Sequence, residues 1–265
     1  KSLEKTIGNC IFISFAAGLV IMIGGPLLTT PMLRAMNTLP EMFDACRDYL
    51  NIFFWGIFGF MFYNIFAGIL RGLGDSFSAL LFLIICAALN VAGDLLLVEK
   101  MGVAGVALAT VIAQMISAVL CLIKLMGMGD IFTLRREYIK PDAEYLRSII
   151  RLGVPSGITQ AIMSASMLIV QALVNSFGDA MLVAANVMVM RVDGYAMLPN
   201  FSFGQAMGTY AGQNVGAGRL DRLKPGTRQG TAMTVLTALI LVPVIIWFGP
   251  ALMDLFAPGN TELIN

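Results

Sequence analysis

The sequence has 265 residues, of which 58% are hydrophobic and 12% are charged, and its formal net charge is +1. Soluble domains carry roughly 25% charged residues, so this composition argues against a water-soluble fold, and the small net charge argues against a nucleic-acid partner. The sequence contains no histidine, which excludes metal sites and acid–base catalysis that depend on this residue.

Long intervals that are almost free of charge divide the chain into predicted membrane spans. A helix needs about 20 residues to cross roughly 30 Å of hydrocarbon. In chain order, the apolar intervals are 6–33, 49–70, 76–98, 101–123, 152–178, 180–218 and 229–253. The third contains Asp94, the sixth contains Arg191 and Asp193, and the others contain no charged residue. Because helices satisfy their own backbone groups in lipid, we predict an all-α, polytopic transmembrane helix bundle with seven spans.

The distribution of basic residues predicts the orientation of these spans. If the helices alternate in direction, residues 1–8, 71–76, 124–151 and 219–228 share one side and hold 13 of the 17 basic residues. The opposite side holds three, and Arg191 lies within a span. Basic loops are retained in the cytoplasm. We therefore expect a multi-pass protein of the plasma membrane, with Lys1 on the cytoplasmic side and Asn265 on the extracellular side.

Segments between the spans predict a linker and several tight turns. The longest polar segment, 127–151, is expected to be a solvated cytoplasmic linker, with a new helix starting at Pro141-Asp142. Gly102, Gly105 and Ala109 form a pattern of small residues that allows a neighbouring helix to approach closely. The glycine-rich stretch 72–74 is interpreted as a turn, and 212–218 as the end of a helix followed by a tight turn, since neither has the GK[ST] sequence of an ATP-binding loop.

Polar side chains inside the predicted spans are the candidates for a substrate or ion path, because such residues usually face a cavity or another helix. The candidates are Asn90, Asp94, Gln160, Gln171, Asn175, Asn186, Arg191, Asp193, Asn200 and Gln205. Asn90 and Asp94 are four residues apart and therefore project from one helix face, as do Gln171 and Asn175. Interhelical hydrogen bonds that only fix the packing are the alternative role for these residues. For Asp94, a position near the outer end of its helix is a further alternative.

Arg191 and Asp193 raise a specific question, because they lie two residues apart in an apolar interval. That spacing rotates them by about 200° around a helix, so they are not expected to pair with each other. Arg191 would lie roughly 16 Å from the start of the span, where an ionisable group costs about 2.5–3.5 kcal/mol. Gly194 and Pro199 allow a kink, and transporters bind their substrates beside interrupted helices near the bilayer midplane.

The first and last spans resemble each other, which predicts an internal repeat. Both begin with basic residues, cross the membrane, and reach a Gly-Pro pair followed by an apolar turn, at 25–26 and 249–250. Parallel repeats of this kind are common in transporters. Together with the odd number of spans, the repeat predicts that the chain is a fragment lacking flanking helices on both sides.

The segment 66–114, FAGILRGLGDSFSALLFLIICAALNVAGDLLLVEKMGVAGVALATVIAQ, resembles the multidrug and toxic compound extrusion (MATE) family. It contains an RG-x-GD turn at 71–75, an N-x3-D helix at Asn90 and Asp94, and a G-V-x-G-x-A-x-A-T helix at 102–110. The sequences RLGVPSG (151–157) and GQNVGAGRLDR (212–222) follow in the family's order.

This resemblance implies a transporter with about twelve helices in two pseudo-symmetric lobes. The chain would correspond to helices three to nine: residues 1–126 form the last four helices of the N-terminal lobe, 127–151 the cytoplasmic inter-lobe linker, and 152–265 the first three helices of the C-terminal lobe. The implied activity is secondary antiport, in which amphipathic, often cationic drugs or toxic compounds leave in exchange for H⁺ or Na⁺. No ATP, cofactor or metal site is expected.

The chain departs from the family pattern at the coupling residues. Some Na⁺-coupled members carry an acidic residue where this chain has Met163, and the first-helix carboxylate of another branch would precede Lys1. Asp193 therefore remains the candidate acidic group on physical grounds. The alternatives are a lipid-linked oligosaccharide flippase of the same superfamily and a non-transporting membrane scaffold. An enzyme is not expected, because the sequence shows neither a clustered carboxylate pair nor a nucleophile with a base.

Overall fold

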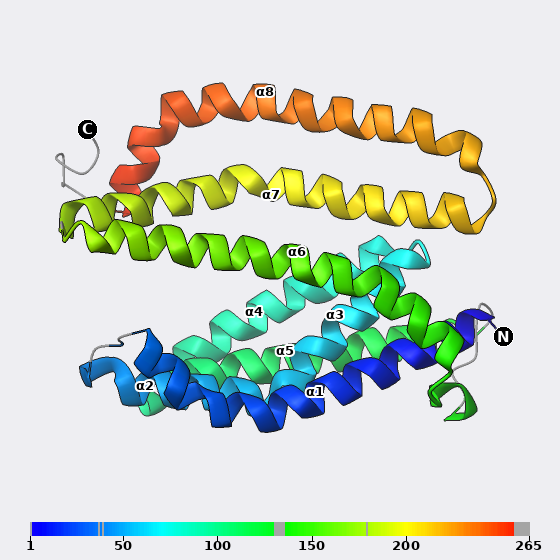
Figure 1. Cartoon of the computed structure of the whole chain (residues 1–265), viewed down its shortest axis with the longest axis horizontal. Coiled ribbons are helices and arrows are strands. Elements are labelled where there is room, and N and C mark those ends of the chain that lie inside the picture. Colours follow the sequence, from blue (N-terminus) through cyan, green and yellow to red (C-terminus); the bar gives the residue numbers. More distant parts are fainter. Residues whose placement is uncertain (1, 37, 39, 130–135, 179, 257–265) are drawn as a thin grey trace. The chain divides into compact units, whose positions relative to one another are not determined.

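The computed structural model describes residues 2–36, 38, 40–129, 136–178 and 180–256, and all regular elements among them are helical (Figure 1). In chain order they are α1 (Ser2–Ala35), α2 (Pro40–Trp55), α3 (Ile57–Gly72), α4 (Ser76–Met101), α5 (Val103–Met126), the 3₁₀ turn η1 (Arg136–Ile139), α6 (Ala143–Ser176), α7 (Ala180–Gly216), the 3₁₀ turn η2 (Leu220–Arg222) and α8 (Leu223–Phe256). The prediction of an all-α membrane bundle is confirmed. Lys1 and Asn265 lie outside the described residues, so the orientation of the chain stays a prediction.

The predicted span at 49–70 is divided between two helices. Six helices of the described chain are individually long and apolar enough to cross a membrane, and α2 with α3 forms a seventh candidate that is bent by 50°. The bend falls at Gly56, where a Cβ atom would overlap the side chain of Val111 in α5. Close contact with α5 therefore requires glycine at the bend, and the predicted count of seven holds only when the bent pair is one span.

The Gly-Pro pairs do not end their helices, contrary to the expected turns. Pro26 lies inside α1, which continues to Ala35, and the pair at 249–250 lies inside α8, which continues to Phe256. Membrane helices tolerate proline because neighbouring groups satisfy the backbone. Near Pro26, the buried hydroxyl of Thr29 donates a hydrogen bond of 3.0 Å to the Gly25 carbonyl.

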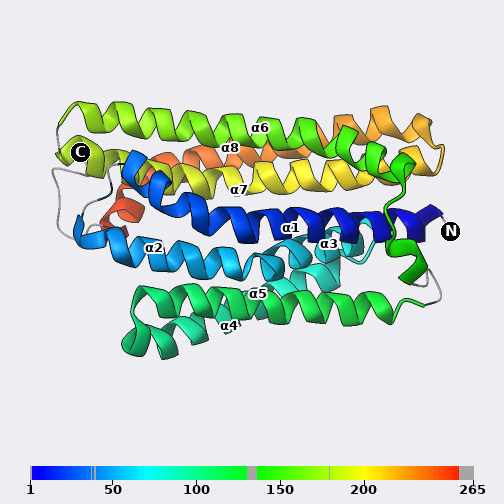
Figure 2. The ribbon, with the colours of Figure 1, turned by 60° about the horizontal axis from the view of Figure 1, so that its bottom comes forward.

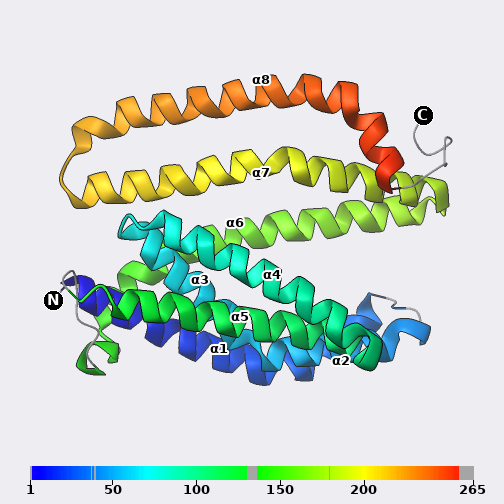
Figure 3. The same ribbon diagram turned by 180° about the vertical axis from the view of Figure 1, so that it is seen from behind.

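The chain forms two compact units, Lys1–Val154 and Pro155–Asn265, and α6 contributes to both. In the first unit, α3 and α4 pack against α5 (Figure 3). The buried core consists of Ile7, Tyr63, Phe66, Ala67, Leu70, Ala79, Ala118, Cys121 and Leu125. Assigning the two units to the lobes of a transporter, with the predicted boundaries of 1–126 and 152–265, stays a prediction.

Small residues bring α4 and α5 together, as the pattern at 102–109 predicts. Gly105 and Ala109 are buried, and a Cβ atom on Gly105 would lie 2.5 Å from the Leu97 carbonyl oxygen. Gly102 has a different role. Its φ of 57° lies in the left-handed region, and a Cβ atom there would meet no neighbouring group within 4 Å, so glycine is required by the turn between α4 and α5 and not by close packing.

In the second unit, α7 packs against α8 (Figure 1). Cβ atoms on Gly226 and Gly230 of α8 would overlap the side chains of Tyr210 and Met207 of α7, so the glycines permit close contact. The predicted turn at 212–218 is confirmed, because α7 ends at Gly216 and Gly218 has a φ of 68°.

The described end of the linker is attached to the start of α1 (Figure 2). The backbone N–H of Asp142 donates to the buried Asn9 side chain (N to Oδ1, 2.8 Å), and Lys5 Nζ lies 3.0 Å from Asp142 Oδ2. The Tyr145 hydroxyl lies 3.2 Å from Ser2 Oγ. The predicted helix start is confirmed, since α6 begins at Ala143. These contacts show that residues 136–142 form an ordered attachment, whereas a solvated connecting loop was expected; residues 130–135 lie outside the described part.

Acid is expected to weaken this attachment. The hydrogen bond from Lys5 holds the pKa of the Asp142 carboxyl below its usual range. A lowered folded-state pKa stabilises the fold at pH values above the ordinary carboxyl pKa of about 3.9, and the stabilisation is lost as the pH falls through the lower folded-state value. The difference in unfolding midpoint between the wild type and Asp142→Asn should therefore be constant near pH 6 and shrink below about pH 4. A difference that stays constant down to pH 3 would contradict the role of the carboxylate.

Candidate functional site

A polar cluster joins α4 and α5 within the first unit. The Asn90 side-chain N–H group lies 3.1 Å from Thr110 Oγ1 and 3.3 Å from Asp94 Oδ1. The Thr110 hydroxyl donates to the Val106 carbonyl at 3.0 Å, so its oxygen is available to accept from Asn90. All three side chains are half-buried. The structure thus places Asn90 and Asp94 on one helix face, as their spacing predicts.

Asp94 supplies the carboxylate of this cluster. Asp94 lies in α4 about two turns before the helix ends at Met101, so a position near the outer end of the helix stays one of its predicted roles. A carboxylate can accept about four hydrogen bonds or bind a cation, and the described contact from Asn90 uses one oxygen. Sequence reasoning did not select Thr110 as a site residue, although it is the last residue of the 102–110 motif. The role of Thr110 depends on the contact between α4 and α5.

Two further candidates meet in the second unit. The Asn186 side-chain N–H group in α7 donates to the side-chain oxygen of Gln171 in α6 at 3.1 Å. Asn186 also lies 3.5 Å from Met190 Sδ. The Gln171–Asn186 hydrogen bond links two membrane helices, which is the packing role that the sequence left open beside cavity lining.

Arg191 and Asp193 are both exposed on α7, on either side of the buried Val192. No ion pair joins them among the described residues, in agreement with their spacing. Met188 and Val192, four residues apart and each 9% exposed, form the buried stripe of the helix in this region. Helix α7 continues from Ala180 to Gly216 through Pro199.

The remaining candidates stay dispersed. Gln160, Asn200 and Gln205 are exposed, and no described hydrogen bond joins any of them to Asp193. Asn200 contacts Met197 Sδ of its own helix at 3.6 Å. Asn175 lies in α6, but its side chain is outside the described part of the structure. The structure therefore groups Asn90 with Asp94 and Gln171 with Asn186, and no described hydrogen bond joins Gln160, Asn200 or Gln205 to either pair.

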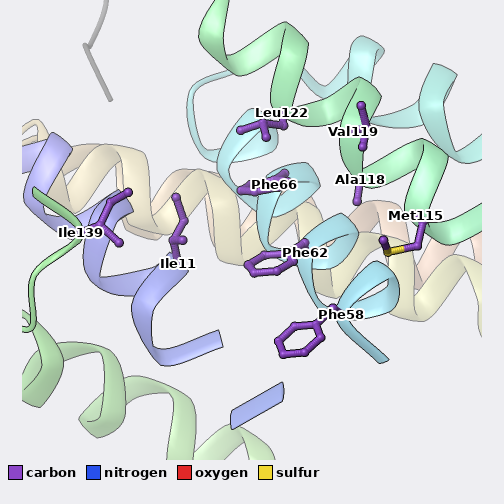
Figure 4. A pocket seen from close by; sticks show the side chains of 9 residues that line it. All are labelled: Ile11, Phe58, Phe62, Phe66, Met115, Ala118, Val119, Leu122 and Ile139. Atoms are coloured by element: carbon purple, nitrogen blue, oxygen red, sulfur yellow. The ribbon is translucent and has the colours of Figure 1, made fainter. Parts of the chain in front are cut away.

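An apolar cavity of about 320 Å³ lies in the first unit between α1, α3, α5 and η1 (Figure 4). Phe58, Phe62 and Phe66 line it from one face of α3. Their rings stack in series, with centroids 5.8 Å and 5.6 Å apart, and Phe15 of α1 extends the stack at 5.4 Å from Phe58. Sequence reasoning considered only polar residues inside spans and missed this phenylalanine stack, although three of its rings recur every fourth residue.

Comparison with known proteins identifies the family. A family model described as MatE matches residues 1–96 and 155–264. The chain belongs to the MATE family. The resemblance seen in the sequence motifs is thereby confirmed, and the chain is a multi-pass membrane protein of this family.

Among curated MATE-related proteins, the probable multidrug resistance protein YoeA of Bacillus subtilis is 30% identical over 99% of this chain and 58% of its own length. The probable multidrug resistance protein YpnP of the same organism is 32% identical over 80% of the chain and 48% of its own length. The chain thus spans about half to three fifths of these relatives.

Solved structures share the fold. A MOP superfamily transporter from Pyrococcus furiosus superposes with a TM-score of 0.87 at 23% identity, covering 100% of this chain and 60% of its own. An outward-facing MATE family multidrug resistance transporter superposes with a TM-score of 0.84 at 22% identity, covering 99% and 62%. At these identities the likeness establishes the MATE fold alone.

The Gln171–Asn186 contact predicts a measurable coupling between α6 and α7. In a double-mutant cycle, Gln171→Ala and Asn186→Ala should show an interaction free energy of about 0.6 kcal/mol, the average for hydrogen bonds between membrane helices. Unfolding of the purified protein by a denaturing detergent would measure it. A cycle of Gln171→Ala with the exposed Asn200→Ala is the control and should show additivity. Additivity in both cycles would contradict the contact.

Proposed function

We propose that this MATE protein is a secondary antiporter of the plasma membrane, exporting amphipathic, often cationic compounds in exchange for H⁺ or Na⁺. The hydrogen-bonded carboxylate of Asp94 inside a membrane helix is the observation that carries the proposal. The multidrug resistance proteins to which the chain is similar support the class of substrate. The predicted distribution of basic residues supports a cytoplasmic start and an extracellular end.

The proposed mechanism is competition for carboxylates during alternating access of two lobes. An ionised carboxylate attracts either a cationic compound or the coupling ion, and binding of the ion releases the compound. Asp94 serves this role in the first unit, held by Asn90, and Asp193 is the second candidate on α7. Arg191 balances the charge of Asp193 or of another carboxylate. Neither ATP nor a bound cofactor takes part in this mechanism.

The phenylalanine stack supports an amphipathic substrate. Its cavity is lined by Phe58, Phe62 and Phe66 together with aliphatic side chains and Met115. Such a surface suits the apolar part of a drug-sized compound, and ring faces also attract cations. A lipid-linked oligosaccharide would instead require several cations for its phosphates, and Arg191 is the single arginine in the described middle of a span. The flippase alternative is therefore less well supported.

Transport by the full-length protein in proteoliposomes tests the proposal. With an imposed H⁺ or Na⁺ gradient, the wild type should export a fluorescent cationic dye. Asp94→Asn should reduce coupled export by at least about tenfold, since the loss of one membrane charge interaction amounts to roughly 1.4 kcal/mol or more. Asp193→Asn tests the second carboxylate in the same assay.

The control variant is Asp44→Asn, because Asp44 is an exposed carboxylate that pairs with Arg47 on α2. It should transport like the wild type. Unchanged export by both Asp94→Asn and Asp193→Asn, at every pH and Na⁺ concentration, would overturn the proposed carboxylate mechanism. Wild-type protein that moves no dye under either gradient would favour the scaffold alternative.

A further inference from the structure

Two cations share one face at the start of α8. Lys224 and Arg228 are four residues apart, so their side chains project from the same side of the helix. Both are exposed, and together with Pro225, Gln229 and Ala232 they line a surface hollow of about 490 Å³. The hollow, which we call the α8 cationic groove, lies entirely within the second unit.

Contact with α7 fixes the rotation of α8 at this point. Gly226 and Gly230 lie against Tyr210 and Met207, whose side chains a Cβ atom at either glycine would overlap. Each of the two cations lies two residues from one of these glycines, or about 200° around the helix. The α8 cationic groove therefore opens on the side of α8 that faces away from α7. The Tyr210 hydroxyl also donates to the Arg222 carbonyl at 3.0 Å, which fixes the turn just before the groove.

No acidic side chain of the described chain neutralises the groove. Asp221, which precedes it, is bound by Arg219 through two contacts of 3.2 Å and 3.3 Å. Neither Lys224 nor Arg228 makes an ion pair with a described residue. The basic start of α1 differs in this respect, because Lys5 there is paired with Asp142 of the same chain. The α8 cationic groove thus keeps two positive charges for an external anion.

We propose that the α8 cationic groove binds the headgroup phosphate of an anionic phospholipid. The groove lies at the start of α8, and the chain beyond Gln229 contains no charged residue until Asp254, so the groove borders the hydrocarbon region. Guanidinium and ammonium groups both bind phosphate, the former through two parallel hydrogen bonds. Basic clusters next to membrane helices attract anionic lipids. Pro225 and Ala232 supply apolar surface beside the cations. A lipid uses both this apolar surface and the position at the membrane boundary, whereas an acidic peptide would not require that position.

This binding is independent of the proposed transport activity, and lipid retention by the full-length protein tests it. Native mass spectrometry in detergent would compare added phosphatidylglycerol with phosphatidylcholine. The wild type should retain phosphatidylglycerol preferentially. The double variant that combines Lys224→Gln and Arg228→Gln should retain phosphatidylglycerol about tenfold more weakly, while its retention of phosphatidylcholine is unchanged. If the double variant fails to fold, each single variant carries the same test, with a smaller loss expected.

The matched control is Lys140→Gln with Arg147→Gln, which removes two exposed cations from the same predicted side of the membrane. It should retain phosphatidylglycerol like the wild type. Equal retention by wild type and the groove variant, or equal losses in both double variants, would overturn the proposal. Displacement of the lipid by millimolar inorganic phosphate would identify a site for free phosphate, and that outcome also overturns it.

Discussion

Replacing Gly105 by alanine is expected to destabilise the first unit by about 1–3 kcal/mol, the usual cost of forcing an extra carbon into a packed interface. Its Cβ atom would lie 2.5 Å from the carbonyl oxygen and 2.8 Å from the carbonyl carbon of Leu97. Both are backbone atoms of α4, so no side-chain rotation can make room. Helices α4 and α5 would have to separate. This movement would break the contact between Asn90 and Thr110 that positions Asp94.

Gly24→Ala provides the matched control. Gly24 also lies in a helix of the first unit, but its Cβ atom would meet nothing within 4 Å. Alanine favours a helix over glycine by about 1 kcal/mol, so this variant should be as stable as the wild type or slightly more stable. Thermal unfolding in detergent, followed by tryptophan fluorescence, would compare the two. Equal stability of both alanine variants would contradict the close packing of α4 on α5.

Removal of the Asn9 side chain is expected to cost about 1–3 kcal/mol, because it leaves a polar group of the linker without its partner. Asn9 is fully buried, and its side-chain oxygen accepts the hydrogen bond from the Asp142 backbone. Asn9→Ala should therefore lower the unfolding temperature. It should also increase hydrogen exchange at residues 136–146, which mass spectrometry of the exchanged peptides would detect.

Asn64→Ala is the control for the loss of a hydrogen bond within a single helix, as distinct from the loss of the linker attachment. Asn9 donates to the carbonyl four residues earlier at 2.8 Å, and Asn64 makes the same contact at the same distance. Asn64 is exposed and makes no described contact with the linker. Its replacement should leave exchange at 136–146 unchanged. If both variants loosened the linker equally, the hydrogen bond from Asp142 could not be the cause.

The spans and part of the site were predictable, because they depend on local spacing. Charge-free intervals mark the helices, since charge is excluded from hydrocarbon along the whole length of a span. The four-residue spacing of Asn90 and Asp94 likewise fixes a shared face on any helix. The family motifs added the order of these elements, and the comparisons confirm the family.

Features that depend on contacts between distant residues were not predictable in the same way. The bend at Gly56 depends on Val111, which comes from another helix. The linker was expected to be solvated because its composition is polar, whereas its attachment requires Asn9, far away in sequence. The phenylalanine stack had a periodic signal, but aromatic periodicity in a membrane helix equally fits lipid contact. The roles of Arg191 and Asp193 depend on neighbours that spacing alone does not reveal.

The attachment of the linker to α1 bears on the order in which the first unit is completed during synthesis. Asn9 emerges among the first residues described, yet the backbone group that it binds belongs to Asp142. A nascent chain that has reached only the end of α5 therefore lacks the partner of a buried side chain. Folding of the first unit is therefore expected to be complete only after translation has entered α6, so a polypeptide truncated after Val154 should fold better than one truncated after Met126.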